Sequence, residues 1–71
     1  MPTDITCDLV ANVIGVFVSV GDRVEAGAEV VLLESMKMEI PVLVEAAGTV
    51  SEVKVAVGDV AQEGDVLVTL A

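Results

Sequence analysis

Few residues of this chain could take part in covalent chemistry, and the most conspicuous is Lys37, which lies between Met36 and Met38. The chain has three basic residues, twelve acidic residues and no histidine, so no imidazole is present as a base or metal ligand. Cys7 is the only thiol, which excludes an intrachain disulfide, and we expect it to be an inert strand residue. The acidic residues occur singly, without the spacing of a metal site. We therefore expect a protein that is not an enzyme and that binds no metal.

Length and charge narrow the possible partners. Seventy-one residues form one small domain, residues 1–71, and the formal charge is −9. Three dispersed bases cannot form a basic patch, which argues against binding to nucleic acid or to an anionic membrane. The N-terminal residues MPTDITCDL carry no basic segment typical of a secretory signal, and the longest apolar run is too short to span a membrane. We expect a cytoplasmic protein, and a monomer.

The elements that must position Lys37 are encoded in an internal repeat. Residues 11–34 align without gaps with residues 48–71 when the chain is shifted by 37 residues, with nine identities in 24 positions. Each half follows the pattern Val-x-x-Val-x-Val-x-Val-Gly-Asp-x₄-Gly-x₃-Val-x-Leu. The sequence thus predicts one structural unit that is built twice.

Alternation of valines with other residues predicts a half-buried strand over residues 16–20, and again over residues 53–57. Valines 16, 18 and 20 would face the core, with Phe17 and Ser19 exposed, and Lys54 would lie along the second such strand. Gly-Asp would then begin a turn in which Asp accepts from backbone amides two residues on. The extra residue between Val13 and Val16, and between Val50 and Val53, predicts a bulge in each half. We expect an all-β fold of two pseudo-symmetric antiparallel units, facing each other as a flattened barrel or sandwich.

Lys37 lies between the repeats, in the segment VLLESMKMEIPVLV. Two apolar strands separated by a few residues predict a hairpin with SMKM at its tip, and Pro41 suits an edge strand. Taken alone, Lys37 could be a solvated turn charge and the methionines could be core filler. Two large apolar side chains at an exposed tip cannot both be core, however, so the tip is a candidate site of presentation to another protein.

The segment ESMKMEIPV, together with the Gly-Asp…Gly spacing, resembles the biotinyl/lipoyl attachment domain family over most of the chain, and most closely in form its small free-standing members. The resemblance implies a flattened β-barrel of two four-stranded sheets related by a pseudo-twofold axis, with the lysine on a tight hairpin. It matches Lys37 to the residue that carries covalent biotin, Met36 and Met38 to its flanks, and Glu34 to the acid three residues earlier. The loop between Gly21 and Gly27 is short, so the protruding thumb of some family members is absent.

The resemblance implies a biotin carrier that a biotin protein ligase modifies on Lys37. Such a carrier would move activated CO₂ between biotin carboxylase and carboxyltransferase subunits acting in trans. Two alternatives stay open. One is a lipoyl carrier, although lipoyl domains resemble DKA rather than MKM at the tip. The other is an unmodified interaction module that uses the methionine-rich tip as an adhesive patch.

Overall fold

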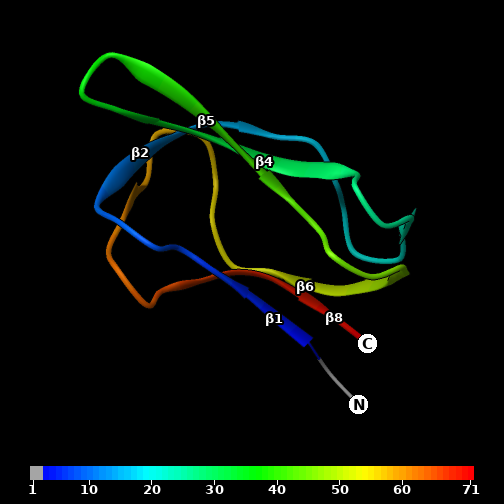
Figure 1. Cartoon of the computed structure of the whole chain (residues 1–71). Helices are drawn as coiled ribbons and strands as arrows, with labels where there is room; N and C mark the ends of the chain where they lie inside the picture. Colours follow the sequence, from blue (N-terminus) through cyan, green and yellow to red (C-terminus); the bar gives the residue numbers. More distant parts are fainter. Residues whose placement is uncertain (1–2) are drawn as a thin grey trace.

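The computed structural model describes residues 3–71, which form eight β-strands arranged in two four-stranded antiparallel sheets (Figure 1). One sheet has the strand order β1-β8-β6-β3 and the other β5-β4-β2-β7. The predicted all-β architecture is confirmed. The strands are β1 (Thr3–Thr6), β2 (Ala11–Val16), β3 (Arg23–Val24), β4 (Glu29–Ser35), β5 (Met38–Leu43), β6 (Gly48–Val53), β7 (Val60–Ala61) and β8 (Val66–Leu70).

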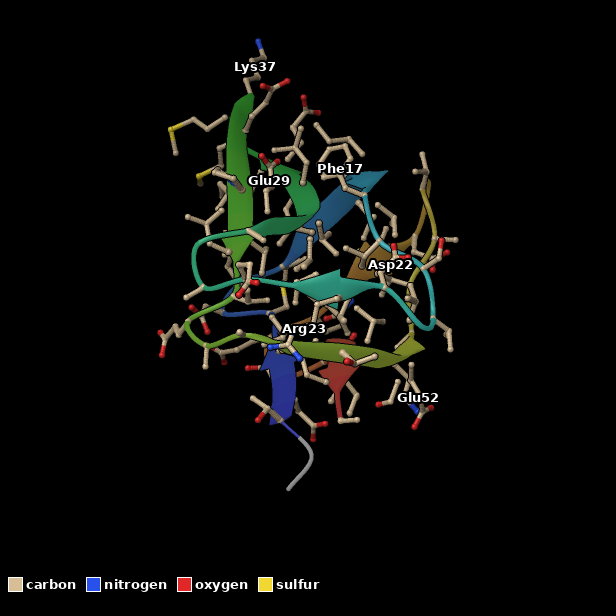
Figure 2. All side chains as sticks on the ribbon, turned by 90° about the vertical axis from the view of Figure 1, so that its right-hand side faces the viewer. Phe17, Asp22, Arg23, Glu29, Lys37 and Glu52 are labelled. Atoms are coloured by element: carbon tan, nitrogen blue, oxygen red, sulfur yellow. The ribbon has the colours of Figure 1, made fainter. Side chains whose placement is uncertain are left out.

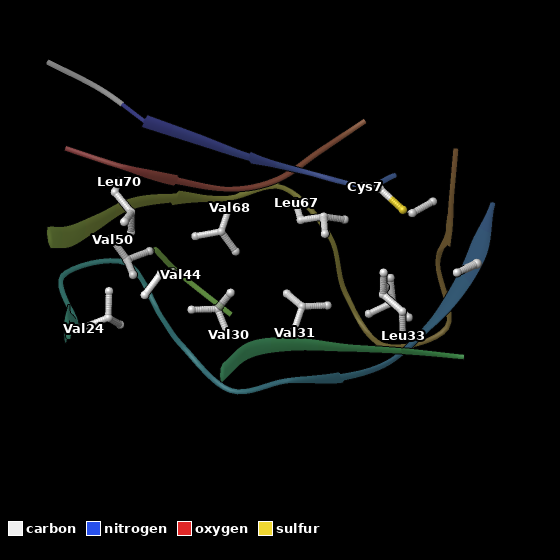
Figure 3. Packing of buried hydrophobic residues seen from close by; sticks show 13 residues of the cluster. Cys7, Val24, Val30, Val31, Leu33, Val44, Val50, Leu67, Val68 and Leu70 are labelled. Carbon is white, nitrogen blue, oxygen red and sulfur yellow. The ribbon is translucent and has the colours of Figure 1, made fainter. Parts of the chain in front are cut away.

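The two sheets enclose a core of small branched side chains, which Figure 3 shows as rows between the layers. Val30, Val31, Leu67 and Val68 have no exposed surface, and they come from the two central strands β4 and β8. Burial of an aliphatic side chain of this size stabilises a fold by roughly 1.5–3 kcal/mol. The two halves thus place aliphatic side chains at equivalent core positions, where Val31 corresponds to Val68 and Val30 to Leu67.

The internal repeat is also a structural repeat. Adding 37 to the residue numbers converts β2 into β6 and β3 into β7, with the same bounds. Each half also reaches into the sheet of the other: the amide of Gly21 donates to the carbonyl of Val50, and that of Gly58 donates to the carbonyl of Val13. The two halves are thus interlocked about a pseudo-twofold axis and share one core.

The predicted bulges are present at both equivalent places. The register between β2 and β4 shifts between Val13 and Gly15, and the register between β6 and β8 shifts between Val50 and Glu52. The extra residue lets the valines on both sides of each bulge turn toward the core, which explains why their spacing changes from even to odd.

The predicted extent of these strands was wrong. The strands end at Val16 and Val53, and Val20 and Val57 are exposed by 66% and 64% rather than buried. Each exposed valine is the second residue of a tight turn whose third residue is a glycine at positive φ, 96° for Gly21 and 100° for Gly58. The chain reverses at these turns, which lie beyond the strand ends, so Val20 and Val57 do not reach the core.

The aspartates of these turns bond to backbone amides earlier in the chain, whereas the sequence predicts amides two residues later. The carboxylate of Asp22 accepts a hydrogen bond from the amide of Ser19, three residues earlier, at 2.9 Å. Asp59 and Asp65 do the same for Ala56 and Gln62, also at 2.9 Å. Each carboxylate closes its own turn and satisfies an amide that the ended strand leaves without a partner.

Cys7 lies just after β1 rather than within a strand, and it is 2% exposed. A shift of 37 residues places it on Val44, which is equally buried. Both residues make the same backbone contact, since Gly64 donates to the carbonyl of Cys7 as Gly27 does to that of Val44. Cys7 therefore fills a core position that the other half gives to valine. In the described part of the chain, no helix has the length and hydropathy of a membrane span.

Candidate functional site

Lys37 occupies the turn of the β4–β5 hairpin, which projects from one end of the molecule (Figures 1 and 2). The strands pair up to Ser35 and Met38, so the connection contains only Met36 and Lys37. The predicted tip is thus confirmed and is shorter than the four residues SMKM. A two-residue connection between paired strands fixes the direction of its side chains more tightly than a longer loop.

Both residues of this connection have left-handed backbone conformations. Met36 has φ 53° and Lys37 has φ 65°, and they are the only non-glycine residues at positive φ among those described. Two consecutive residues of this kind define a type I′ turn, which Asn-Gly normally occupies. An L-residue in this region costs roughly 1–2 kcal/mol. Among the described residues, a non-glycine residue adopts this conformation only at the apex that carries Lys37.

The two methionines differ in their surroundings. Met36 is 89% exposed, so it does not pack against the hairpin base, while Met38 is 60% exposed and pairs with Ser35 at the last rung of the ladder. Core packing is therefore excluded for Met36. The tip presents an amine between two flexible, polarizable apolar side chains that a partner protein can cover.

Two carboxylates lie directly opposite each other just below the tip. Glu34 on β4 pairs with Glu39 on β5, and Glu34 is half-buried while Glu39 is exposed. Like charges at directly opposed positions destabilise a sheet. The tip region therefore carries one positive and two negative groups, and acylation of Lys37 would leave only the two negative ones.

Lys54, the other lysine, is in a different setting. The sequence predicts Lys54 within a strand, but it lies just after the end of β6. Its Nζ is 2.8 Å from a carboxylate oxygen of Glu52. The hydrogen bond and charge of Glu52 raise the pKa of Lys54 above its usual 10.5.

Among residues 3–71 no three potential metal ligands cluster together. Two clefts, of about 460 and 450 Å³, are lined by segments other than the hairpin tip, so Lys37 stands on a projection rather than in a pocket.

Comparison with known proteins agrees with this geometry. The biotin/lipoyl family, described as "Biotin-requiring enzyme", matches residues 3–70. The chain belongs to this family. It is 52% identical over 71 residues to the biotinylated protein TB7.3 homolog of Mycobacterium leprae, and the match covers 100% of both chains. It is 46% identical over 67 residues to the biotin/lipoyl attachment protein of Bacillus subtilis, covering 94% of this chain and 92% of that one.

Among solved structures, the biotin/lipoyl domain described here matches a part of the urea carboxylase of Kluyveromyces lactis. The TM-score is 0.92 at 27% sequence identity, over 100% of this chain and 6% of that one. The family fold of two four-stranded sheets is therefore shown. The sequence predicts Lys37, Met36, Met38 and Glu34 as candidate site residues, and the structure places all four at or just below one hairpin tip. The sequence did not predict Glu39 as the direct partner of Glu34.

Proposed function

We propose that this chain is a biotin carrier in which Lys37 Nζ holds biotin through an amide bond. The observation that carries the proposal is the position of an exposed primary amine at the apex of a strained two-residue turn, flanked by Met36 and Met38. The names of its relatives, a biotinylated protein and a biotin/lipoyl attachment protein, support biotin as the group. The residues fit this group chemically, because a primary amine and a carboxyl group form an amide.

Attachment would require chemistry from another protein. The Nζ atom must lose a proton and attack an activated carboxyl carbon, so that a C–N bond forms and the C–O bond to the activating group breaks. No histidine is present to accept that proton, and the carboxylates beside the tip, Glu34 and Glu39, occupy opposed strand positions below it. A biotin protein ligase would supply the base and exclude water. Acylation removes one positive charge, so the formal charge of −9 becomes −10.

The chain itself would position the attached group rather than catalyse. When bound, biotin supplies the ability to accept a carboxyl group at one active site and release it at another. The hairpin holds Lys37 away from the body of the barrel, so the arm extends into an enzyme cleft without unfolding the domain. Biotin carboxylase and carboxyltransferase subunits are the proposed partners, and the likeness to part of a urea carboxylase supports this assignment.

The test is co-expression with a biotin protein ligase, followed by intact-mass measurement and peptide mapping. We expect one biotin per chain, on Lys37, and none in Lys37→Arg, which keeps the charge but cannot form the amide. Lys54 serves as an internal control, because it is the other lysine and is paired with Glu52. Biotin on Lys54, or a lipoyl mass increment on Lys37 in the source cells, would contradict the proposal.

A further inference from the structure

The outer surface of the sheet that carries Lys37 is apolar over its central strands. Leu32 on β4 pairs with Gly15 on β2 and with Pro41 on β5, and its buried neighbours Val31 and Leu33 face the other way. Phe17, the single aromatic residue, is 55% exposed. We call the surface formed by Gly15, Phe17, Leu32 and Pro41 the apolar face.

The ring of Phe17 is held against this sheet. A Cβ atom built on Gly15 would lie 2.8 Å from Cζ of Phe17 and 3.4 Å from Cβ of Leu32. The ring therefore lies back over Gly15 and extends the surface of Leu32, instead of projecting freely into solvent. An aromatic side chain has only two rotatable dihedral angles, so it loses little conformational freedom when a partner covers it.

The equivalent positions in the second half of the repeat show which side chains the same backbone accepts. The shift of 37 residues places the four positions of the apolar face on the outer surface of the other sheet, where the residue pairing is the same: Glu52 faces Thr69, and Thr69 faces Asp4. There, however, the side chains form an ion pair of 2.8 Å between Lys54 and Glu52 and a hydrogen bond of 3.1 Å from Thr69 to Asp4. The correspondences are Gly15 with Glu52, Phe17 with Lys54, Leu32 with Thr69, and Pro41 with Asp4.

Folding therefore does not require apolar side chains at these four positions, because the equivalent surface is polar and folds in the same way. Among residues 3–71, the apolar side chains occur at these positions on the sheet that presents Lys37 and polar ones on the other sheet. Figure 2 shows Phe17 in the same half of the molecule as Lys37, with Glu52 toward the opposite end. The asymmetry between two otherwise repeated surfaces indicates recognition rather than stability.

The charge of the chain and the separation of the apolar face from Lys37 limit which protein can cover this face. A second copy of the chain is disfavoured, because each copy carries a formal charge of −9 and Glu34 and Glu39 lie between the apolar face and Lys37. A partner with an apolar centre and a basic rim is complementary. Leu32 precedes Lys37 by five residues, or about 16 Å of strand at 3.3 Å per residue.

We propose that the apolar face is the docking surface for the biotin carboxylase subunit, and the charge of the carrier requires that partner to present an apolar centre with a basic rim beside its cleft. An enzyme that acylates Lys37 must enclose the tip itself, since the reacting nitrogen is there. An enzyme that acts at the far end of the attached arm meets the side of the hairpin while the tip rests in its entrance. This inference rests on the proposed carrier function.

The test replaces residues of the apolar face by the polar residues found at the equivalent positions of the other sheet. Gly15→Glu/Phe17→Lys copies the Glu52–Lys54 pair, leaves the net charge unchanged and removes the ring that a Cβ at position 15 would meet. Leu32→Thr, which copies Thr69, is an independent second variant. The matched control is Glu52→Ala/Lys54→Ala, which also preserves net charge but alters the opposite sheet. Thermal unfolding verifies that each variant is folded.

Two measurements follow. The first is the Kd of each chain, in the Lys37→Arg background that cannot be biotinylated, for the purified biotin carboxylase subunit of the source organism. We expect Kd to rise about tenfold for both apolar-face variants, as for a residue central to an interface, and less than twofold for the control. The second is ATP- and bicarbonate-dependent carboxylation of the biotinylated chains, where KM should rise by a similar factor while kcat is retained.

The outcomes separate this inference from the proposed function. An unchanged Kd in the apolar-face variants, or an equal rise in the control, overturns the docking surface. A fall in the rate of biotinylation without a change in Kd assigns the face to the ligase and also overturns it. If the wild-type chain takes up no biotin at all, the carrier function fails, but the Kd series still decides whether the face binds the carboxylase subunit.

Discussion

Replacing Met36 by Asn and Lys37 by Gly should stabilise the domain while removing the proposed acceptor amine. The reason is the conformation of the turn, in which both residues lie in the left-handed region, with φ 53° and 65°. Asn-Gly is the pair that a type I′ turn prefers. Neither native side chain contributes core packing that the substitution would remove, because Met36 is 89% exposed and Lys37 is exposed as well.

The size of the gain follows from two opposing terms. Each L-residue in the left-handed region costs roughly 1–2 kcal/mol, of which Gly removes nearly all and Asn removes part. Glycine also increases the conformational entropy of the unfolded chain, which offsets roughly 0.5–1 kcal/mol. The net gain should be about 1 kcal/mol, and for a domain of this size that corresponds to a rise in Tm of about 4–8 °C.

Urea denaturation with thermal unfolding measures this gain, and Met36→Ala/Lys37→Ala is the matched control because alanine keeps the unfavourable conformation. The control should stay within about 0.5 kcal/mol of the native chain. Gly58→Ala measures the same backbone effect in reverse: Gly58 has φ 100° and no atom within 4 Å of an added Cβ, so a loss of stability there reflects conformation alone. An Asn-Gly variant no more stable than the alanine control would refute the idea that the native turn is strained.

Three further changes probe the rest of the fold. Asp59→Ala should lower the free energy of unfolding by about 1 kcal/mol, because the carboxylate accepts the Ala56 amide at 2.9 Å, whereas Asp59→Asn should lose less; equal losses in urea denaturation would contradict the turn-closing role. Gly15→Ala should displace the Phe17 ring, whose Cζ would lie 2.8 Å from the new Cβ, at a cost below about 1 kcal/mol, and the same change in a Phe17→Ala background should be nearly neutral. Glu52→Gln should lower the pKa of Lys54, measured by NMR titration, because Glu52 raises that pKa by a hydrogen bond and by its charge. The raised pKa means that the pair's contribution to stability is present at neutral pH and is lost as pH rises through the pKa of Lys54, and a titration unaffected by the substitution would show the pair to be absent in solution.

Much of the fold could be predicted because the sequence contains an internal repeat, in which residues 11–34 align with residues 48–71. The valine pairs Val13/Val50 and Val31/Val68 recur at the same place in both halves and are buried strand positions, and the repeated Gly-Asp marks a turn. Coincidence is a poor explanation for either repetition. The repeated change of spacing between Val13 and Val16 located the bulge in the same way. The hairpin at Lys37 was predictable for a different reason, since apolar strands flank a short segment that holds two methionines and a charge.

The errors have physical causes that a pattern of residue types does not contain. Val20 and Val57 continue the alternation of the strand before them, yet both are exposed in turns. Hydrophobicity alone cannot reveal that change, because the following glycine reverses the chain before the valine can reach the core. The left-handed turn at Met36 and Lys37 was equally hidden, since neither residue favours that conformation. Cross-strand partners such as Glu34 and Glu39 require the register, which only the structure supplies.

The repeat also separates the residues that the fold requires from those that a partner requires. Where the halves agree, as at the core valines and the turn glycines, the shared residue is explained by folding. Where equivalent positions differ sharply, as Phe17 differs from Lys54, folding alone explains neither choice, because one backbone accepts both. The hairpin tip is the extreme case: β4 and β5 are joined by a turn, while their counterparts β8 and β1 pair side by side without one. Both halves of the repeat therefore contribute to the shared core, but only one of them has a hairpin turn that carries an amine. The apolar residues that replace polar ones at equivalent positions lie in the sheet that carries this turn.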